Sequence, residues 1–245
     1  MPVRGSEETP AVRNETVAQR LVAACRGVTI AFRLSIPTAF HLAAPHYDIR
    51  QAGYRAENAG GSIADGYARS ANRVAVVTAQ NGPAATLLAP PLANALKASI
   101  PVVAVVQEVP RWQADKNAFQ EFDHYRLFDG VAKWVRRVDD PARLDDYVDM
   151  AFVATASGRP GPAVLLVPFD VLALPAQPGI PRHTDLSAFP LDSAVADPSP
   201  VAEAVDLLAG ARAPLLSKAA ACISRTPRRL WRACRRRVRC RSPPR

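Results

Sequence analysis

Two apolar runs, Val74-Ala75-Val76-Val77 and Pro101-Val102-Val103-Ala104-Val105-Val106, decide the fold of this chain. Each run is apolar on both faces, as a central strand must be when helices cover both sides of its sheet. Segments with helical spacing separate these runs from further short, β-branched runs. This alternation is typical of βαβ units around a parallel sheet. The sequence therefore predicts an α/β fold: a doubly wound, mostly parallel sheet with helices on both faces.

The same patterns predict the individual elements. We expect strands over residues 28–32, 49–54, 74–78, 102–106, 134–138 and 163–167. We expect helices over residues 15–25, 38–44, 58–70, 84–98, 119–128 and 141–157. Asp140-Pro141 predicts a clear helix start, because an aspartate can cap and a proline has no N–H to leave unpaired there. Pro90-Pro91 is expected to kink or interrupt the helix that contains it.

Composition divides the chain into five segments. Residues 1–13 are expected to be a flexible N-terminus, and residues 14–171 form the α/β domain. Residues 172–200 are rich in proline, aspartate and serine, which predicts a linker. Residues 201–216 resemble the first helix and strand approach of a second domain, and residues 217–245 form a tail too poor in aliphatic residues to build a core.

The charge of the chain is concentrated in that tail. The whole sequence has a formal net charge of +9, which by itself suggests an anionic partner such as nucleic acid. The tail holds ten arginines, one lysine and no acid, which leaves 20 basic against 22 acidic groups in residues 1–216. The folded part is thus mildly acidic, and we expect no specific nucleic-acid partner. No apolar run approaches the length that spans a bilayer, so we expect a cytoplasmic protein without a membrane partner.

The main candidate for chemistry lies in the stretch Tyr54-Arg55-Ala56-Glu57-Asn58-Ala59-Gly60-Gly61-Ser62-Ile63-Ala64-Asp65-Gly66-Tyr67-Ala68-Arg69. Glu57 follows one predicted strand and opens a predicted helix. Ligands of open α/β sheets bind beyond the carboxyl ends of the strands, so Glu57 is placed for a ligand. An acid in the first turn is also favoured by the helix macrodipole alone. Taken by itself, Glu57 is more often such a helix-start acid than a ligand-binding group.

This stretch resembles the Arg-His-Glu and Ala-Asp-Gly-Tyr-Ala-Arg signature of thiamine-diphosphate-dependent enzymes, in their N-terminal pyrimidine-binding domain, and especially of the acetolactate synthase-like family. Further matches keep the family's order: Thr78-Ala79-Gln80-Asn81-Gly82-Pro83-Ala84-Ala85-Thr86, Ala98-Ser99-Ile100-Pro101-Val102-Val103, Phe119-Gln120-Glu121 and Gly158-Arg159-Pro160-Gly161-Pro162. The resemblance covers about residues 14–216. Several motifs in order are more specific than any one of them, and together they favour the catalytic interpretation of Glu57.

The resemblance implies a role for each candidate residue. Glu57 would be catalytic: it would hydrogen-bond N1′ of the cofactor's aminopyrimidine and help thiamine diphosphate lose its C2 proton, which prepares the attack on a 2-keto acid. The turn Asn81-Gly82-Pro83 would bind the cofactor by bringing backbone close to its flat ring. Phe119 and Gln120 would face the substrate. No metal ligand is expected in this chain.

The resemblance also implies an activity and a partner. The activity is decarboxylation of a small-molecule 2-keto acid with carboligation. Another thiamine-diphosphate-dependent decarboxylase or transferase of the same superfamily, and a non-catalytic fragment with a basic nucleic-acid-binding tail, stay open as alternatives. Sites in the family form between two subunits. We therefore expect a homodimer, or association with a chain that carries the diphosphate-binding domain.

Part of the family's site has no counterpart in this sequence. The family holds the diphosphate and Mg²⁺ on a C-terminal domain through Gly-Asp-Gly followed by Asn, and the sequence contains no Gly-Asp-Gly. Acetolactate synthases hold FAD largely on a middle domain, of which residues 201–216 would be the start. We therefore expect a truncated enzyme that is inactive alone. Our hypothesis for the abrupt change of composition at Ser217 is out-of-frame translation or a gene remnant.

Three further expectations concern single residues. Arg33 stands where relatives often have a glycine, so the loop after the first strand is expected to be perturbed. Gly60 and Gly61 are expected to serve close packing of their helix. The four histidines show no metal spacing and no nearby nucleophile, and each is expected to be a solvated side chain: His41, His46, His124 and His183.

Overall fold

The computed structural model describes residues 15–25, 30–33, 37–177, 186–188, 190–191 and 196–211. At its centre is a six-stranded sheet with the order β2-β1-β3-β4-β6-β5, in which every pair of neighbouring strands is parallel. The strands are β1 (Ile30–Arg33), β2 (Arg50–Gly53), β3 (Ala75–Ala79), β4 (Val102–Glu108), β5 (Trp134–Arg137) and β6 (Ala163–Pro168). The predicted α/β class is confirmed.

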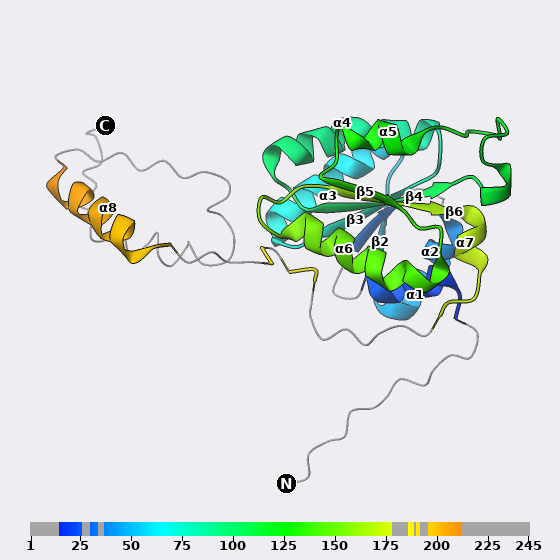
Figure 1. Cartoon of the computed structure of the whole chain (residues 1–245), viewed down its shortest axis with the longest axis horizontal. Helices are drawn as coiled ribbons and strands as arrows, with labels where there is room; N and C mark the ends of the chain where they lie inside the picture. The colour runs from blue at the N-terminus through cyan, green and yellow to red at the C-terminus, as the bar shows by residue number, and fades with distance from the viewer. Residues whose placement is uncertain are drawn as a thin grey trace, which may run out of the picture.

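Helices cover both faces of the sheet, and the strands supply a core to each face. One core joins the sheet to α1 (Val17–Ala24), α2 (Thr38–Ala43) and α6 (Leu144–Ala156). The other joins it to α3 (Glu57–Ala71), α4 (Pro83–Ala98) and α5 (His124–Asp129). Successive strand residues go to opposite cores, as Val76 and Val77 of β3 do, because side chains alternate along a strand. Figure 1 shows the two helical layers on either side of the strands.

Five further elements complete the described chain. They are the 3₁₀ turns η1 (Ala44–Tyr47), η2 (Arg111–Gln113) and η3 (Pro141–Arg143), and the helices α7 (Phe169–Ala173) and α8 (Pro198–Gly210). The predicted start at Asp140-Pro141 is confirmed: the Asp140 carboxylate accepts a hydrogen bond from the Ala142 N–H at 2.9 Å. Figure 1 shows α8 apart from the layered domain, and none of its residues is buried.

One local prediction, that Pro90-Pro91 kinks or interrupts its helix, was wrong about the interruption. Pro90-Pro91 does not interrupt α4, which continues as one helix from Pro83 to Ala98. Each proline lacks the N–H that would pair with the preceding turn, so packing has to compensate for the loss. Pro91 is buried against Gly61 of α3, and a side chain on Gly61 would come within 2.5 Å of the proline ring. The pair also confirms that Gly61 serves packing.

The described parts of residues 172–200, which the sequence indicates as a linker, contact the domain. Leu172 is buried in the first core, and Leu186 and Leu191 pack against it. The backbone carbonyl of Ser187 accepts the Val74 N–H at 3.0 Å. Residues 1–13, 34–36 and 217–245, for which a flexible segment, a perturbed loop and a tail were predicted, lie outside the described residues. No helix among the described residues is long and apolar enough to cross a membrane.

Candidate functional site

The predicted site residues all follow strands at one edge of the sheet. Because the strands are parallel, their carboxyl ends lie at the same edge, which is where open α/β sheets bind ligands. Glu57 follows β2, the turn Asn81-Gly82-Pro83 follows β3, and Phe119 and Gln120 lie in the loop after β4. The topology thus brings three separate motifs to one edge.

Glu57 is the first residue of α3 and is only 7% exposed. Among the described residues, its carboxylate has neither a hydrogen bond nor an ion pair. Proximity to the positive end of the helix dipole favours an acid at this position. That interaction supplies no hydrogen bond, so the carboxylate oxygens are free to accept one from a ligand.

A hydrogen bond from Tyr54 ties the chain ahead of Glu57 to the centre of the sheet. The Tyr54 hydroxyl donates to the backbone carbonyl of Thr78, the penultimate residue of the core strand β3. The Tyr54 ring lies against Gly60 of α3, where an added Cβ would come within 2.4 Å of it. The missing side chain of Gly60 thus makes room for the ring, which confirms the packing role predicted for this glycine.

The turn after β3 is joined to the loop after β4. The Asn81 side-chain amide donates to the backbone carbonyls of Phe119 at 3.3 Å and Gln120 at 3.0 Å. The Gln80 amide donates to the Gln120 side-chain oxygen at 2.9 Å. Gly82 has φ 62° and ψ −125°, and a Cβ there would lie 2.8 Å from the Gln120 carbonyl oxygen. Glycine is therefore required at position 82 both by its backbone conformation and by its close approach to Gln120.

The loop that carries Phe119 and Gln120 is held at both ends by carboxylates. At its start, Asp170 accepts hydrogen bonds from the Arg111 backbone N–H at 3.0 Å and from its guanidinium Nε at 2.7 Å. Burial by itself raises the pKa of Asp170, but these bonds outweigh it and hold the pKa below its usual range. At its end, Glu121 accepts the N–H groups of Ala118 and Asp115, and these bonds lower the pKa of Glu121.

Two of the predicted site side chains differ in their surroundings. Gln120 is partly buried, has φ 61° and is bonded to Gln80 as described above. Phe119 is 83% exposed, so its ring lines no enclosed substrate pocket in this chain. Pro83 begins α4 and is exposed.

The prediction that the histidines are solvated was wrong for two of them. His124 is 2% exposed and His41 is 7% exposed. His46 is exposed as expected, and His183 lies outside the described residues. His41 Nε2 lies 3.3 Å from the Thr78 hydroxyl. Metal spacing and nearby nucleophiles give no information about a histidine that is buried against another polar side chain.

His124 belongs to the candidate site itself. Its Nε2 accepts the backbone N–H of Gly82 at 2.8 Å, and its Nδ1 lies 3.2 Å from Glu108 at the end of β4. The Arg137 guanidinium lies 2.8 Å from the other oxygen of that carboxylate. Glu108, His124 and Arg137 line a hollow of about 530 Å³ beside the loop after β4. In the sequence, the position of His124 is indicated by Asp123, which caps α5 and so makes His124 the first residue of that helix.

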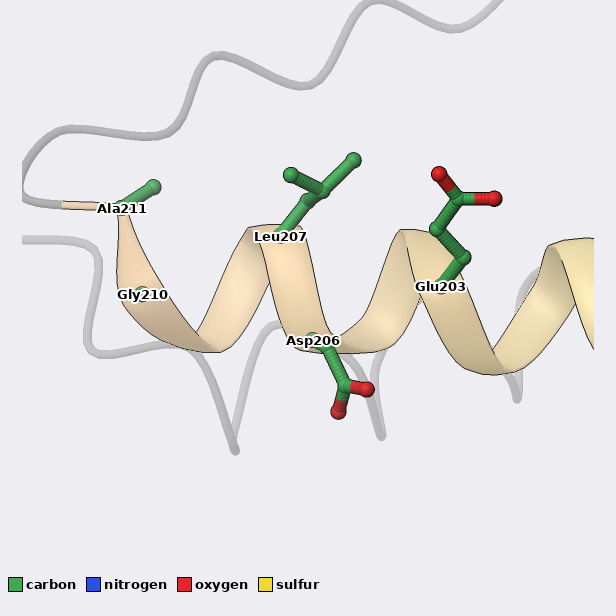
Figure 2. Close-up of a pocket in the computed structure, with 5 residues that line it drawn as sticks. All are labelled: Glu203, Asp206, Leu207, Gly210 and Ala211. Atoms are coloured by element: carbon green, nitrogen blue, oxygen red, sulfur yellow. The ribbon is translucent and has the colours of Figure 1, made fainter.

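A second hollow, on α8, brings no functional groups together. Figure 2 shows Glu203 and Leu207 pointing to one side of the helix and Asp206 to the opposite side. The two carboxylates therefore cannot act on one ligand. Among the described residues, no group of three or more histidine, cysteine, aspartate or glutamate side chains is placed to hold a metal ion.

One part of the chain matches the model of a known protein family. Residues 14–127 match the family model described as "Thiamine pyrophosphate enzyme, N-terminal TPP binding domain". The matched range contains every predicted site residue and His124. Forty-seven curated proteins match with strong significance.

Similar curated proteins include acetolactate synthases. The chain is 37% identical over 190 residues to an acetolactate synthase large subunit of Parasynechococcus marenigrum, a match that covers 75% of this chain and 30% of that protein. It is 35% identical to an acetolactate synthase of Arthrospira platensis over 70% of this chain and 29% of that protein. It is 39% identical to a chloroplastic acetolactate synthase of Zea mays over 48% of this chain and 18% of that protein. The matched part thus spans less than a third of each relative's length.

Proposed function

We propose a function on the premise that this chain carries the N-terminal cofactor-binding domain of the thiamine pyrophosphate enzymes and is of the acetolactate synthase kind. In this proposal, Glu57 binds the aminopyrimidine of thiamine diphosphate and forms one half of an active site. A chain that carries the diphosphate-binding domain supplies the other half. The completed site decarboxylates a 2-keto acid and joins the remaining fragment to a second one.

The position of Glu57, a largely buried residue whose carboxylate has no partner among the described residues, is the observation that supports this assignment. Glu57 is 7% exposed, lies at the carboxyl edge of the sheet and has no hydrogen-bond or ion-pair partner among the described residues. A protonated ring nitrogen of an aminopyrimidine is a donor of the kind that such a carboxylate lacks. A charge-assisted hydrogen bond of this type is roughly twice as strong as a neutral one. The residues present therefore fit the pyrimidine half of the cofactor.

The chain's own groups have separate tasks in the proposed site. The bound cofactor supplies the electron sink that a 2-keto acid needs in order to lose carbon dioxide. Glu57 would hold a proton at the pyrimidine N1′ atom through a hydrogen bond to its carboxylate. The turn Asn81-Gly82-Pro83 offers its backbone to the flat ring, and Gln120, bonded to Gln80, faces the substrate.

The other half of the site is the reason for proposing a partner chain. The sequence has no Gly-Asp-Gly motif for the diphosphate and Mg²⁺. In this proposal, the residues that bind Mg²⁺ and FAD lie outside residues 1–245. Turnover therefore requires association with a diphosphate-binding domain. A cytoplasmic location is part of the same proposal.

Two measurements test the function. The full chain should gain thermal stability from thiamine diphosphate, and the Glu57→Gln variant should lose that gain. With pyruvate, thiamine diphosphate and Mg²⁺, the chain alone should show no turnover. Addition of a chain bearing the diphosphate-binding domain should produce turnover that Glu57→Gln lowers about 100-fold or more. Turnover and stabilisation that are unchanged by Glu57→Gln would refute the assignment.

A further inference from the structure

The hydrogen bonds of His124 determine which of its ring nitrogens carries the proton. The Gly82 backbone N–H is a donor and points to Nε2 at 2.8 Å, so Nε2 must present a lone pair. In a neutral imidazole the proton then lies on Nδ1, which donates to the Glu108 carboxylate at 3.2 Å. The buried ring therefore bridges a backbone donor and a carboxylate, and it can do so only when it is neutral.

Gly82 is a residue whose conformation needs such an external bond. Its φ of 62° lies in a region that glycine enters freely, and glycine loses more conformational entropy on ordering than any other residue. The carbonyl of Gln120 lies close against it, where a Cβ would be 2.8 Å away. The His124 Nε2 atom also contacts Gly82, because it accepts the hydrogen bond of the Gly82 backbone N–H. Gly82 is thus fixed by packing against Gln120 and by the bond to His124.

The contact is anchored to the centre of the fold. Glu108 is the last residue of β4, and its second oxygen pairs with Arg137, the last residue of β5, at 2.8 Å. His124 begins α5, whose start is capped by the Asp123 side chain. The turn after β3 is therefore connected through one imidazole to two further strands and a helix.

We propose that His124 is a positioning residue that holds the turn Asn81-Gly82-Pro83 in the conformation that receives the aminopyrimidine. This inference rests on the proposed function, because that function assigns the cofactor to the turn. His124 does not touch the reacting atoms. It acts through the Gly82 amide, and loss of the Nε2 lone pair, by substitution or by protonation, loosens the turn and weakens cofactor binding.

Protonation of the His124 ring would place two hydrogen-bond donors against each other. An imidazolium has N–H groups on both nitrogens, so its Nε2–H would face the Gly82 N–H, donor against donor. The charged groups nearest the ring are Glu108, on its Nδ1 side, and Arg137, which pairs with the same carboxylate. Other acids line the hollow on the loop side of the ring: Asp115, Glu121 and Asp123. Acid solution is therefore expected to break the Gly82 bond rather than strengthen it.

Two substitutions separate positioning from bulk packing. In His124→Gln, the side-chain oxygen can take the place of Nε2 and accept the Gly82 N–H, and glutamine does not titrate. In His124→Leu, the volume is similar but no acceptor remains. The probes are the exchange rate of the Gly82 amide proton, followed by NMR in the full chain without cofactor, and the thermal stabilisation by thiamine diphosphate.

We expect His124→Leu to speed Gly82 amide exchange and to weaken thiamine diphosphate binding, each by about tenfold, the loss of one hydrogen bond. His124→Gln should restore both to within about threefold of the wild type. On acidification the Gly82 amide should lose protection in the wild type but not in His124→Gln. The inference is overturned if the leucine variant keeps the Gly82 protection and the cofactor affinity, or if the glutamine variant is as impaired as the leucine variant.

The experiment also distinguishes this inference from the proposed function. If the wild-type chain is not stabilised by thiamine diphosphate, the proposed function fails and the cofactor part of the inference fails with it. The Gly82 exchange rates and their pH dependence are measured without cofactor, so they still test whether His124 fixes the turn. A cofactor response that depends on Glu57 but is equal in all three forms at position 124 supports the function and refutes the positioning role.

Discussion

The hydroxyl of Tyr54 donates a hydrogen bond to the backbone carbonyl of Thr78, and this contact joins the chain just ahead of Glu57 to the core strand β3. β2 lies at one edge of the sheet, with β1 between it and β3. The side chain thus spans one strand to connect the two places from which Glu57 and the Asn81-Gly82-Pro83 turn arise. The relative position of the two proposed cofactor contacts depends on it.

Tyr54→Phe tests that contact. The phenyl ring keeps its packing against Gly60, but the Thr78 carbonyl loses a buried partner, so we expect a loss of about 1–2 kcal/mol in the free energy of unfolding. Stabilisation by thiamine diphosphate should fall as well. Tyr47→Phe is the matched control, because its hydroxyl bonds to Glu15 away from the site. A normal cofactor response in Tyr54→Phe would show that the bond does not position Glu57.

Gly61→Ala tests the close packing of α3 on α4. The added Cβ would lie 2.5 Å from the Pro91 ring, and we expect a loss of about 1–3 kcal/mol in urea unfolding because two packed helices must separate. Gly66→Ala in the same helix meets nothing within 4 Å. It should stabilise the protein by roughly 0.5–1 kcal/mol, since alanine is the better helix former. Equal effects at the two positions would contradict the packing explanation.

Glu121→Gln tests the closure of the loop that carries Gln120. Backbone N–H groups from residues 115 and 118 hold the pKa of Glu121 below its usual range. Because the pKa of Glu121 is lowered in the folded state, the hydrogen bonds of its carboxylate stabilise the loop fully above the pKa of the unfolded chain, about 4.3. This stabilisation is lost as the pH falls through the pKa of the folded state. We expect the amides of Asp115 and Ala118 to be protected at neutral pH and to lose protection in acid.

The glutamine variant should remove that pH dependence. Its side chain still has one oxygen acceptor, so protection should be several-fold lower than in the wild type at neutral pH and similar to it in acid. Amide exchange followed at several pH values measures both effects. Protection that is the same in both proteins throughout would mean that the carboxylate does not close the loop.

Asp170→Asn tests the other end of the same loop. Burial raises the pKa of Asp170, but the bonds from the Arg111 backbone and guanidinium together lower it by more. The net shift of the pKa is therefore downward. The stabilisation from the Asp170 carboxylate is therefore fully present above the pKa of the unfolded chain, about 3.9. It disappears as the pH falls through the pKa of the folded state. We expect the variant to lose about 1 kcal/mol at pH 7, a modest amount because Arg111 is partly exposed.

The pH dependence decides the interpretation of that loss. Urea unfolding of wild type and Asp170→Asn should give free energies that converge in acid, where the wild-type carboxyl is also neutral. Asp146→Asn is a suitable control, because Asp146 and Arg143 form an ion pair whose two side chains are more than half exposed. A difference between wild type and Asp170→Asn that persists unchanged in acid would point to packing rather than charge.

Local patterns were sufficient to predict most of the fold. The runs around Val76 and Val103 became buried strands, because an apolar run on both faces has no other stable place in a layered α/β domain. Asp140 became a cap because its short side chain reaches backbone only two residues away. The order of the motifs around Glu57 indicated the family, and that depends on sequence alone.

Tertiary structure decided the surroundings of each candidate residue. The effect of Pro90-Pro91 depended on Gly61, which lies on another helix, so the proline rule by itself gave the wrong result. The need for glycine at position 82 comes partly from Gln120, which is distant in sequence. His124 looked like a solvated histidine because nothing within its own segment bonds to its ring; its partners, Gly82 and Glu108, arrive from other parts of the fold.

The sequence by itself therefore determined the strands and the helix starts, and it indicated a family and Glu57 as a candidate, since each depends on spacing and residue type along one stretch of chain. Only the tertiary structure decided that Glu57 is 7% exposed and that His124 bonds to the turn after β3. The burial and the hydrogen bonds of these side chains depend on segments that become neighbours only when the parallel sheet brings the carboxyl ends of its strands to one edge. A local sequence pattern contains no information about such contacts.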